Sequence, residues 1–461
     1  MVTVAGGRFA PGHIGELTRI VPFEMVDAAV TETGAVQRRV RELPSRVVVY
    51  LLLAGGLFAG VGYGQVWARM IAGLDGLEVA APTAGALAQA RRRIGIAPLR
   101  ALFDLLRGPA AGVSVKGVRW RGRLVTAVDA TIVCCPDTES NLAVYHRGGG
   151  NHGGTGYPMV RLLAVVACGT RTIIDAVFGT DRVGEISYAH QLVGALRAGM
   201  IVLADRNFAV RAWIIAVAGT GADLLIRVKT NRVLPVCARL RDGSYVSRIG
   251  PVEVRVITAE ITIATSTGRR TERRTERRTE RRSEVYRLIT TVLDPDCPAV
   301  EIIRLYHERW EIETTFLELK STTLGGRVLR ARTPTGVDQE IYALLSVYQA
   351  LRIAISDATL DRTDLDPDRA SFTVALHAAR DQLIQAAGVL TDTLADTVVD
   401  LVGVIGQAVL AHLMPARRLR TNPRVVKRAI SKYVASSARG RHRGPSRKAT
   451  INIDILTNTD P

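Results

Sequence analysis

The sequence predicts an α/β protein in which a helical region precedes a mixed central sheet and a helical, basic region follows it. Apolar residues recur at helical spacing over residues 14–110, strand-like runs alternate with amphipathic helices over 123–228, and helical patterning returns after 298. The chain has 461 residues, of which 47% are hydrophobic and 23% charged. It is therefore long enough for two or three domains with at least one large core.

Residues 1–115 are predicted to form a helical N-terminal domain. Their most apolar stretch, Val47–Tyr63, has about 17 residues, the least that can span a bilayer. Because it contains four glycines, a buried helix pair is favoured over a membrane span. Residues 1–20 also lack the charged start and apolar run of a signal peptide. We therefore predict no membrane partner.

From Arg123 onward the pattern changes to strand, strand, strand, helix, strand, helix, strand, with a hairpin expected around Gly169-Thr170. This order fits a ribonuclease-H-like fold over residues 116–228 and 300–358. The pattern alone leaves other α/β arrangements open.

Two further segments differ in composition from this core. Residues 229–299 are predicted to be a β-rich insertion, and the tandem repeat TERRTERRTERR at 271–282 lies within it. We expect the repeat to be a solvated loop or extended hairpin, with a contact to a DNA backbone as the alternative. Residues 359–461 are predicted to be helical with a basic tail, since 414–448 contains 12 Lys or Arg and no acidic residue. Such a tail is either solvated or binds phosphates by releasing counterions.

The charge balance predicts a polyanionic partner. The chain has 61 Lys and Arg against 43 Asp and Glu, a net charge of +18, and only six of the basic residues are Lys. Arg suits phosphate recognition, so nucleic acid is the first candidate and an anionic membrane surface the second. GC-rich coding would also produce this Arg excess. The cluster at 91–93 is either a phosphate contact or a solvated face.

The five cysteines form no CxxC pair. A scatter of this kind over a long chain predicts reduced thiols, a cytoplasmic location and no structural zinc.

Two carboxylates lie in or at the end of apolar strand-like runs. Asp129 lies inside TAVDATIV, and Asp205 ends MIVLAD just before Arg-Asn-Phe. Removing a carboxylate from water is costly unless it is paired or binds a metal ion. Each Asp alone is ambiguous, because such residues often cap the following turn. Thr131 and Asn207, close beside them, are candidate outer-shell partners.

A helix expected at residues 298–320 gives the stronger indication. Turning by 100° per residue places four polar residues within a stripe about 60° wide. They are Tyr306, Arg309, Glu313 and Lys320. Such a stripe suits metal and phosphate rather than a hydrophobic core. Other positions supply apolar residues for burial, which are Ile302, Ile303, Leu305, Ile312, Phe316 and Leu319.

The segment YHERWEIETTFLELK contains Tyr-x2-Arg-x3-Glu-x6-Lys and follows VDAT and LADRNF. In this it resembles the DDE transposases of bacterial insertion sequences, in the group called insertion-sequence family four. The resemblance covers residues 120–355, including a β-rich insertion before the last carboxylate, and extends less distinctively to the helical N-terminal region. Asp-Ala-Thr stands where Asp-Gly-Thr is common, and the TERR repeat is not a family feature.

The resemblance implies that Asp129, Asp205 and Glu313 are both the catalytic residues and the metal ligands. Their carboxylate oxygens suit two Mg²⁺ or Mn²⁺ ions. One ion would activate water for the first cut and later the 3′-hydroxyl for strand transfer. Two such ions stabilise the attacking and leaving oxygens of a phosphoryl displacement.

The resemblance also implies DNA contacts. Tyr306 and Arg309 would contact phosphate near the transposon end, and Lys320 would contact the terminal DNA. Trp310 either stacks on an unpaired base or packs against the protein. The implied partner is double-stranded DNA, namely terminal inverted repeats and target DNA, bound by residues 1–115 as well. Synapsis of two ends implies a homodimer, in a bacterial cytoplasm and on the nucleoid when DNA is bound.

Three functions remain open at this stage. The leading hypothesis is a transposase that cuts at its terminal inverted repeats and joins the ends to target DNA in a cut-and-paste reaction. A related two-metal nuclease without strand transfer would share the carboxylates and the fold. A catalytically degenerate DNA-binding relative is the third hypothesis, and the intact carboxylates argue against it. The Tyr-Arg-Glu-Lys helix and the large insertion favour the transposase.

Overall fold

The computed structural model describes residues 2–3, 8–39, 41–110, 117–148, 156–271, 274–360, 362, 365–386, 402–415 and 448–456. The chain divides into two compact units. Unit 1 comprises Met1–Ala195 and Trp310–Ala416, and unit 2 comprises Leu196–Arg309 and Arg417–Pro461. The predicted domain boundaries, which cut the chain into four segments, stay a prediction.

Helices form the N-terminal part of unit 1, as the periodicity predicts. They are α1 (Phe23–Glu32), α2 (Ser45–Leu57), α3 (Tyr63–Ile71), α4 (Ala84–Ile94) and α5 (Ala97–Leu106). Two short antiparallel strands precede them, β1 (Val2–Thr3) and β2 (Phe9–Ala10). The apolar stretch of the sequence is one buried helix, α2, followed by a turn, and its partner helix begins only at Tyr63. Within the described ranges, no helix combines the length and apolar character needed to cross a bilayer.

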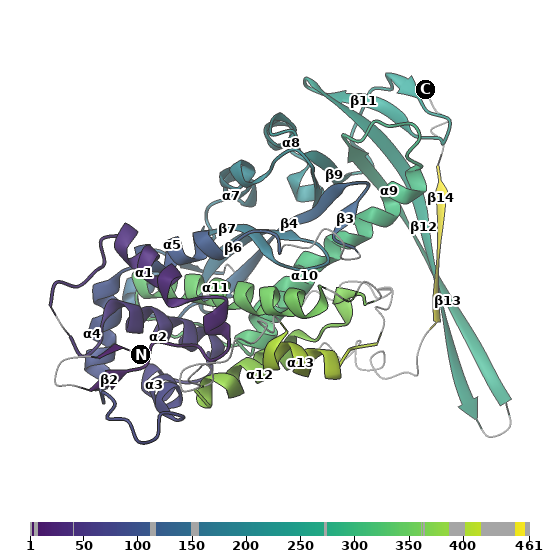
Figure 1. Ribbon diagram of the computed structural model, residues 1–461. Coiled ribbons are helices and arrows are strands. Elements are labelled where there is room, and N and C mark those ends of the chain that lie inside the picture. Colours follow the sequence, from purple (N-terminus) through teal and green to yellow (C-terminus); the bar gives the residue numbers. More distant parts are fainter. Residues whose placement is uncertain are drawn as a thin grey trace. The chain divides into compact units, whose positions relative to one another are not determined.

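The helix α11 (Pro334–Thr359) lies at the centre of unit 1 and is buried over most of its length. It contacts α2, α5, α12 (Phe372–Ile384) and α13 (Gly403–Ala411), as Figure 1 shows. A helix that is apolar on nearly every side is stable only inside a core. The hydroxyl of Thr333 starts α11 by accepting a hydrogen bond from the amide of Gly336 at 3.3 Å.

The sheet of unit 1 is antiparallel. Its strands are β3 (Arg119–Trp120), β4 (Arg123–Cys134), β5 (His146–Arg147), β6 (Pro158–Ala167) and β7 (Ile173–Thr180). The strand β6 pairs with β4, β5 and β7. The turn between β6 and β7 contains Gly169 at a φ of +86° and confirms the predicted hairpin. The glycine-rich loop that follows β5 lies largely outside the described residues.

Short helices and α10 complete this part of unit 1. They are α6 (Glu139–Leu142), α7 (Glu185–Gln191) and α10 (Trp310–Leu317). The helix α10 lies against β4 and β6.

Unit 2 contains a parallel strand pair. The strands β8 (Met200–Ala204) and β9 (Asp223–Val228) are parallel and are joined by α8 (Arg211–Gly219), the helical crossover that such a pair requires. With β4, β6, β7 and α7, they complete the predicted order of strands and helices. Strand pairs of both directions therefore occur, and the predicted mixed α/β class is confirmed.

The predicted β-rich insertion is also confirmed. It consists of β10 (Ala238–Arg239), β11 (Tyr245–Ile249), β12 (Val252–Thr271) and β13 (Arg274–Thr290). The long strands β12 and β13 are antiparallel, and their pairing extends as far as Thr271 opposite Arg274. The TERR repeat therefore lies in the predicted extended hairpin (Figure 1). Two residues of the repeat, 272 and 273, lie outside the described part.

The C-terminal end corrects the sequence prediction. A helical region with a basic tail was expected over 359–461. The helices α12 and α13 lie within it, but β14 (Lys448–Ile455) at its end is a strand that pairs antiparallel with β12. Its apolar residues alternate, which favours a strand, and Ile451 and Ile453 lie opposite Ile263 and Ile261. The basic tail ahead of it falls on residues 416–447, outside the described part.

Candidate active site

Asp129 lies where β4 emerges from the core. The strand is buried from Leu124 to Val128 and partly exposed from Asp129 to Ile132. The Oδ1 atom of Asp129 accepts a hydrogen bond from the amide of Ala130 at 2.8 Å. Since side chains alternate along a strand, Asp129 and Thr131 lie on one face of β4.

The helix expected at 298–320 is not a regular α-helix. Instead, α9 (Ala299–Tyr306) leads into a 3-10 turn (His307–Arg309), then α10, then a π-helical segment (Glu318–Thr323). The predicted stripe about 60° wide assumed 100° per residue, whereas a 3-10 turn advances by about 120°. The geometry of that prediction is therefore wrong, although all six expected apolar residues are buried.

Lys320 connects this helical region to β4. Glu313 lies on α10, half-buried, and Lys320 lies in the π-helical segment. The Nζ atom of Lys320 donates a hydrogen bond to the Oγ1 atom of Thr131 at 3.1 Å. Burial lowers the pKa of Lys320, and nearby Cys134 opposes this in part. The segment that carries Glu313 is thereby joined to the strand that carries Asp129.

Asp205, Tyr306 and Arg309 lie in unit 2. Asp205 directly follows the buried strand β8, and its Oδ1 atom caps a 3-10 turn by accepting from the amide of Asn207 at 2.8 Å. The hydroxyl of Tyr306 donates to the carbonyl of Ala204 at 3.2 Å, so this tyrosine supports the end of β8. Burial raises the pKa of Tyr306, with Arg309 lowering it and Asp205 raising it further.

The predicted site residues are thus distributed over both units. Unit 1 brings Lys320 into contact with the strand of Asp129 and carries Glu313 and the half-buried Trp310, while unit 2 brings Tyr306 next to the end of β8. In the described part of the chain, no three His, Cys, Asp or Glu side chains are gathered closely enough to hold a metal ion.

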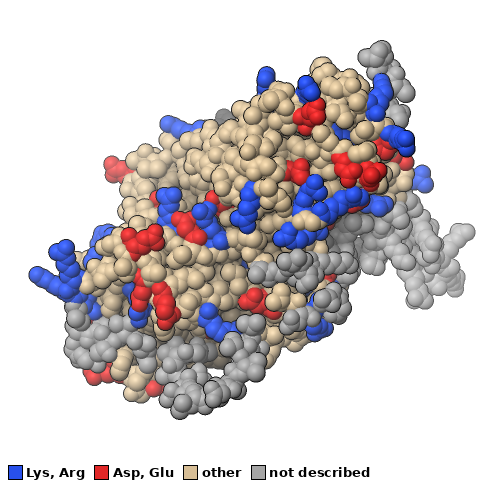
Figure 2. All heavy atoms as spheres, turned by 45° about the horizontal axis from the view of Figure 1, so that its top comes forward, with Lys and Arg blue, Asp and Glu red and all other residues tan. Residues whose placement is uncertain are grey.

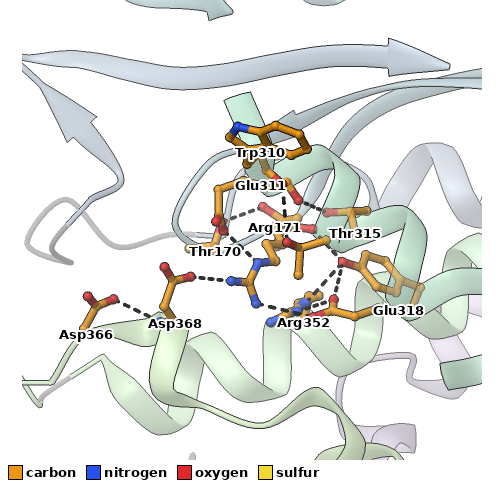
Figure 3. Close-up of polar contacts among 12 residues, drawn as sticks. Thr170, Arg171, Trp310, Glu311, Thr315, Glu318, Arg352, Asp366 and Asp368 are labelled. Atoms are coloured by element: carbon orange, nitrogen blue, oxygen red, sulfur yellow. Dashed lines mark hydrogen bonds and ion pairs between the residues drawn. The ribbon is translucent and has the colours of Figure 1, made fainter. Parts of the chain in front are cut away.

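A buried ionic network includes Glu311 and Glu318, which flank Glu313 in the sequence (Figure 3). The guanidinium of Arg171, in the turn between β6 and β7, donates to Glu311 at 2.7 Å, to Glu318 at 3.3 Å and to Asp368. Burial lowers the pKa of Arg171, but the three carboxylates raise it by more, so the side chain stays charged. Glu311 and Glu318 thereby attach the first turn of α10 and the start of the π-helical segment to the turn between β6 and β7.

The same network reaches α11. Arg352 donates to Glu318, and the hydroxyl of Tyr348 donates to the same carboxylate at 3.0 Å. Arg352 and Tyr348 are almost completely buried, and Glu318 is nearly so. The helix that carries Glu313 is therefore fixed to two other elements of unit 1 by charged contacts.

The sequence prediction did not include this network. Glu311, Thr315 and Glu318 recur at spacings of four and three, which places them on one helix face, and this was the available signal. Their partner Arg171 lies 140 residues from Glu311 in the sequence, so no local pattern connects them.

Two family models match the chain. The model "Insertion element 4 transposase N-terminal" matches residues 11–104, and the model "Transposase DDE domain" matches residues 120–349. Together they cover the helical N-terminal part and every predicted site residue. The chain belongs to the insertion-sequence family four of DDE transposases.

Individual relatives agree with this assignment. The transposase InsG for insertion sequence element IS4 of Escherichia coli K12 is 26% identical over 428 residues, which are 89% of this transposase and 91% of InsG. The putative transposase InsZ of the same organism is 25% identical over 194 residues, or 41% of this chain and 62% of InsZ. A solved structure, the piggyBac transposase synaptic complex with hairpin DNA, matches with a TM-score of 0.42 at 9% identity, covering 88% of this chain and 86% of that one.

The family settles the class of activity and the fold. The protein is an insertion-sequence transposase, an enzyme that cleaves DNA strands and transfers them, with a ribonuclease-H-like catalytic fold. Divalent metal ions and DNA are the cofactor and partner classes of this family.

Proposed function

We propose that Asp129, Asp205 and Glu313 hold two Mg²⁺ or Mn²⁺ ions, with which the transposase cuts its terminal inverted repeats and joins the ends to target DNA. The contact between Lys320 and Thr131 carries this proposal, because it joins the segment of Glu313 to the strand of Asp129. Two carboxylates from distant parts of the sequence are thereby kept on adjoining elements of unit 1.

The donor atoms fit these ions. Carboxylate oxygens are hard ligands of the kind that Mg²⁺ and Mn²⁺ prefer. A backbone amide fixes one oxygen of Asp129 and one of Asp205, which orients both carboxylates before a ligand arrives. Bound cations would stabilise the attacking and leaving oxygens of an in-line phosphoryl displacement.

The neighbouring residues would position the DNA. Tyr306 and Arg309 contact phosphate near the end of the element, and Lys320 contacts the terminal DNA. Tyr306 also holds the carbonyl of Ala204, the residue before Asp205, so it orients the strand end as well. Trp310 is only half-buried, which favours stacking on an unpaired base over packing alone.

The assembly we propose is a homodimer that joins two transposon ends in the bacterial cytoplasm, on the nucleoid when DNA is bound. Light scattering after size exclusion, with and without end DNA, tests it. A mass of one chain per DNA end in the complex, without pairing of ends, would contradict it. The nuclease without strand transfer is the weaker candidate, because the family models are those of transposases.

The carboxylates are tested by the isosteric variants Asp129→Asn, Asp205→Asn and Glu313→Gln. Each should abolish Mg²⁺-dependent cleavage of a duplex carrying the element's own end, while DNA binding stays largely intact. Cleavage, joining to a target plasmid and gel-shift affinity are measured on the same preparations. Glu139→Gln and Asp296→Asn, at exposed positions elsewhere, are matched controls that should keep both steps. Cleavage by any of the three site variants at the wild-type rate would contradict the assignment.

A further inference from the structure

An arginine-lined cavity of about 790 Å³ lies in unit 1, away from the proposed metal ligands. One side comes from the turn after α2, the start of α3 and the later part of α4, and the other from the segment leading into α11 and the first turns of that helix. None of the described residues that line it is Asp or Glu. Five are arginines, namely Arg91, Arg92, Arg327, Arg330 and Arg332. We call this feature the arginine cavity.

One of these arginines is structural. The Nε atom of Arg330 donates to Glu340 at 2.9 Å, and its Nη2 atom donates to the carbonyl of Gly55 at 2.7 Å. The charge of Arg330 is therefore matched within the protein, and its hydrogen bonds hold the end of α2.

The other arginines lack such a match. In the described part of the chain, no carboxylate lies within 4.0 Å of the guanidinium groups of Arg91, Arg92, Arg327 or Arg332. Arg92, Arg327 and Arg332 are exposed. The guanidinium of Arg91 lies 3.7 Å from the ring centre of Tyr63, and its Nε atom is buried with no hydrogen-bond partner among the described residues. A donor in that state is one that a ligand would satisfy.

Two further features favour an anion. The α11 helix begins at the cavity, where Thr333, Thr335 and Gly336 line it, and the first turn of a helix carries a partial positive charge. On the face drawn in Figure 2, acidic side chains lie among the Lys and Arg side chains. The lining of the arginine cavity, without a carboxylate, differs from that mixed surface.

We propose that the arginine cavity binds the phosphodiester backbone of DNA, with Arg92 and Arg332 as the principal contacts. Phosphate is the anion that the planar guanidinium fork matches, and unpaired arginines release counterions when they bind a polyanion. Arg92 lies within the stretch matched by the N-terminal family model and Arg332 within the stretch matched by the DDE model. One DNA strand would therefore contact both matched regions. The proposal rests on the proposed function only in taking DNA as the substrate.

The test removes the charges from Arg92 and Arg332 in the full-length chain. The double variant Arg92→Gln/Arg332→Gln is compared with wild type by fluorescence anisotropy on a duplex carrying the element's end, over a series of salt concentrations without divalent cations. Each lost phosphate contact lowers the slope of log affinity against log salt by about 1, so we expect a reduction of about 2. Phosphate ethylation interference should lose the corresponding backbone positions.

Matched variants make the test specific. Arg182→Gln/Arg197→Gln changes the charge equally at two exposed arginines outside the cavity, and a smaller reduction in slope is expected there. Arg92→Lys/Arg332→Lys keeps the charges and should restore most of the slope. The wild-type slope in the glutamine variant, or an equal loss in the control pair, would overturn the proposal.

A second arm separates DNA from a small anion. Inorganic phosphate raises the melting temperature of a protein that has a small-anion site. Suppose that phosphate raises the melting temperature of wild type but not of the glutamine variant, and that the glutamine variant keeps the wild-type salt slope of DNA binding. The cavity is then a small-anion site, and the DNA proposal fails. Failure of the proposed function would be recognised separately, because it would appear as metal-dependent cleavage by the carboxylate variants. That measurement does not depend on the salt slope of DNA binding.

Discussion

The buried network around Arg171 and the arginine cavity use the same side chain in opposite ways. In the network, Glu311, Glu318 and Asp368 each accept a hydrogen bond from an arginine, and water is excluded. At the cavity, Arg92 and Arg332 are exposed and have no carboxylate partner in the described part of unit 1.

This difference divides the arginines of the chain into two groups, according to whether nearby carboxylates cancel their charge. An arginine surrounded by carboxylates adds nothing to the field that DNA experiences, because its charge is cancelled locally. An arginine without a carboxylate leaves its charge available to a polyanion. The net charge of +18 is therefore a poor guide to the DNA-binding surface until each arginine is assigned to one group or the other.

The largest expected effect is on stability, from removing the centre of the network. Arg171→Met removes the arginine that pairs with the buried carboxylates of Glu311 and Asp368 and leaves Glu318 to Arg352 and Tyr348, which should lower the free energy of unfolding by about 3–5 kcal/mol. Arg171 also has a φ of +58°, so the fold tolerates an unfavourable backbone conformation to place this charge. Urea denaturation followed by tryptophan fluorescence measures the change.

Arg121→Met is the matched control for that experiment. Arg121 also has a left-handed backbone, with a φ of +46°, but its side chain is exposed. Replacing it should change the free energy of unfolding by less than about 0.5 kcal/mol. Equal losses in the two variants would mean that the backbone conformation, and not the buried network, accounts for the effect.

An intermediate effect is expected inside the cavity itself, where Arg330 and Arg92 provide an internal contrast. Arg330→Met should cost roughly 1–3 kcal/mol, because Glu340 and the carbonyl of Gly55 lose a buried partner, while the salt slope of DNA binding stays unchanged. Arg92→Met should reverse this, with little loss of stability and a slope lower by about 1. If both variants lower the salt slope of DNA binding equally, pairing with a carboxylate does not separate structural arginines from DNA-binding ones.

Much of the fold was predictable because its signals are local. The order from β4 to β9 follows from strongly apolar runs separated by turns, and the hairpin at Gly169 from a short turn between two such runs. The strand β14 was missed because it pairs with β12, almost 200 residues earlier, and follows a long basic segment. Periodicity within a window carries no information about such a partner.

The site was predictable to a different degree. Glu313 and its neighbours form a continuous pattern over 15 residues, whereas the breaks in that helix do not appear in the sequence. The π-helical segment begins at Glu318, which Arg171 and Arg352 hold, and contains Lys320, which contacts Thr131. Contacts with residues distant in the sequence accompany this break in the helix. A calculation that assumes a regular turn of about 100° per residue therefore could not predict it.

The smallest expected effect concerns a buried group that stays neutral. His13 is fully buried; its Nε2 atom hydrogen-bonds to the carbonyl of Met70 at 3.0 Å, and its Nδ1 atom accepts from the amide of Gly15 at 3.2 Å. Burial lowers its pKa below the ordinary value of 6.5, although the Met70 contact opposes this. No carboxylate forms an ion pair with it in the described part of the chain, in contrast to Arg171.

A pH series tests this contrast. Below pH 6.5 the unfolded chain takes up the proton of His13 before the folded chain does, so the free energy of unfolding should fall as the pH drops. One proton gives a slope of at most about 1.4 kcal/mol per pH unit. His13→Gln should remove this contribution, while His377→Gln, at an exposed position, should retain it. If the free energy of unfolding of His13→Gln depends on pH in the same way as that of wild type, the core tolerates a charged His13 without a carboxylate partner. The distinction between charges with and without such a partner would then not extend to the N-terminal part of unit 1.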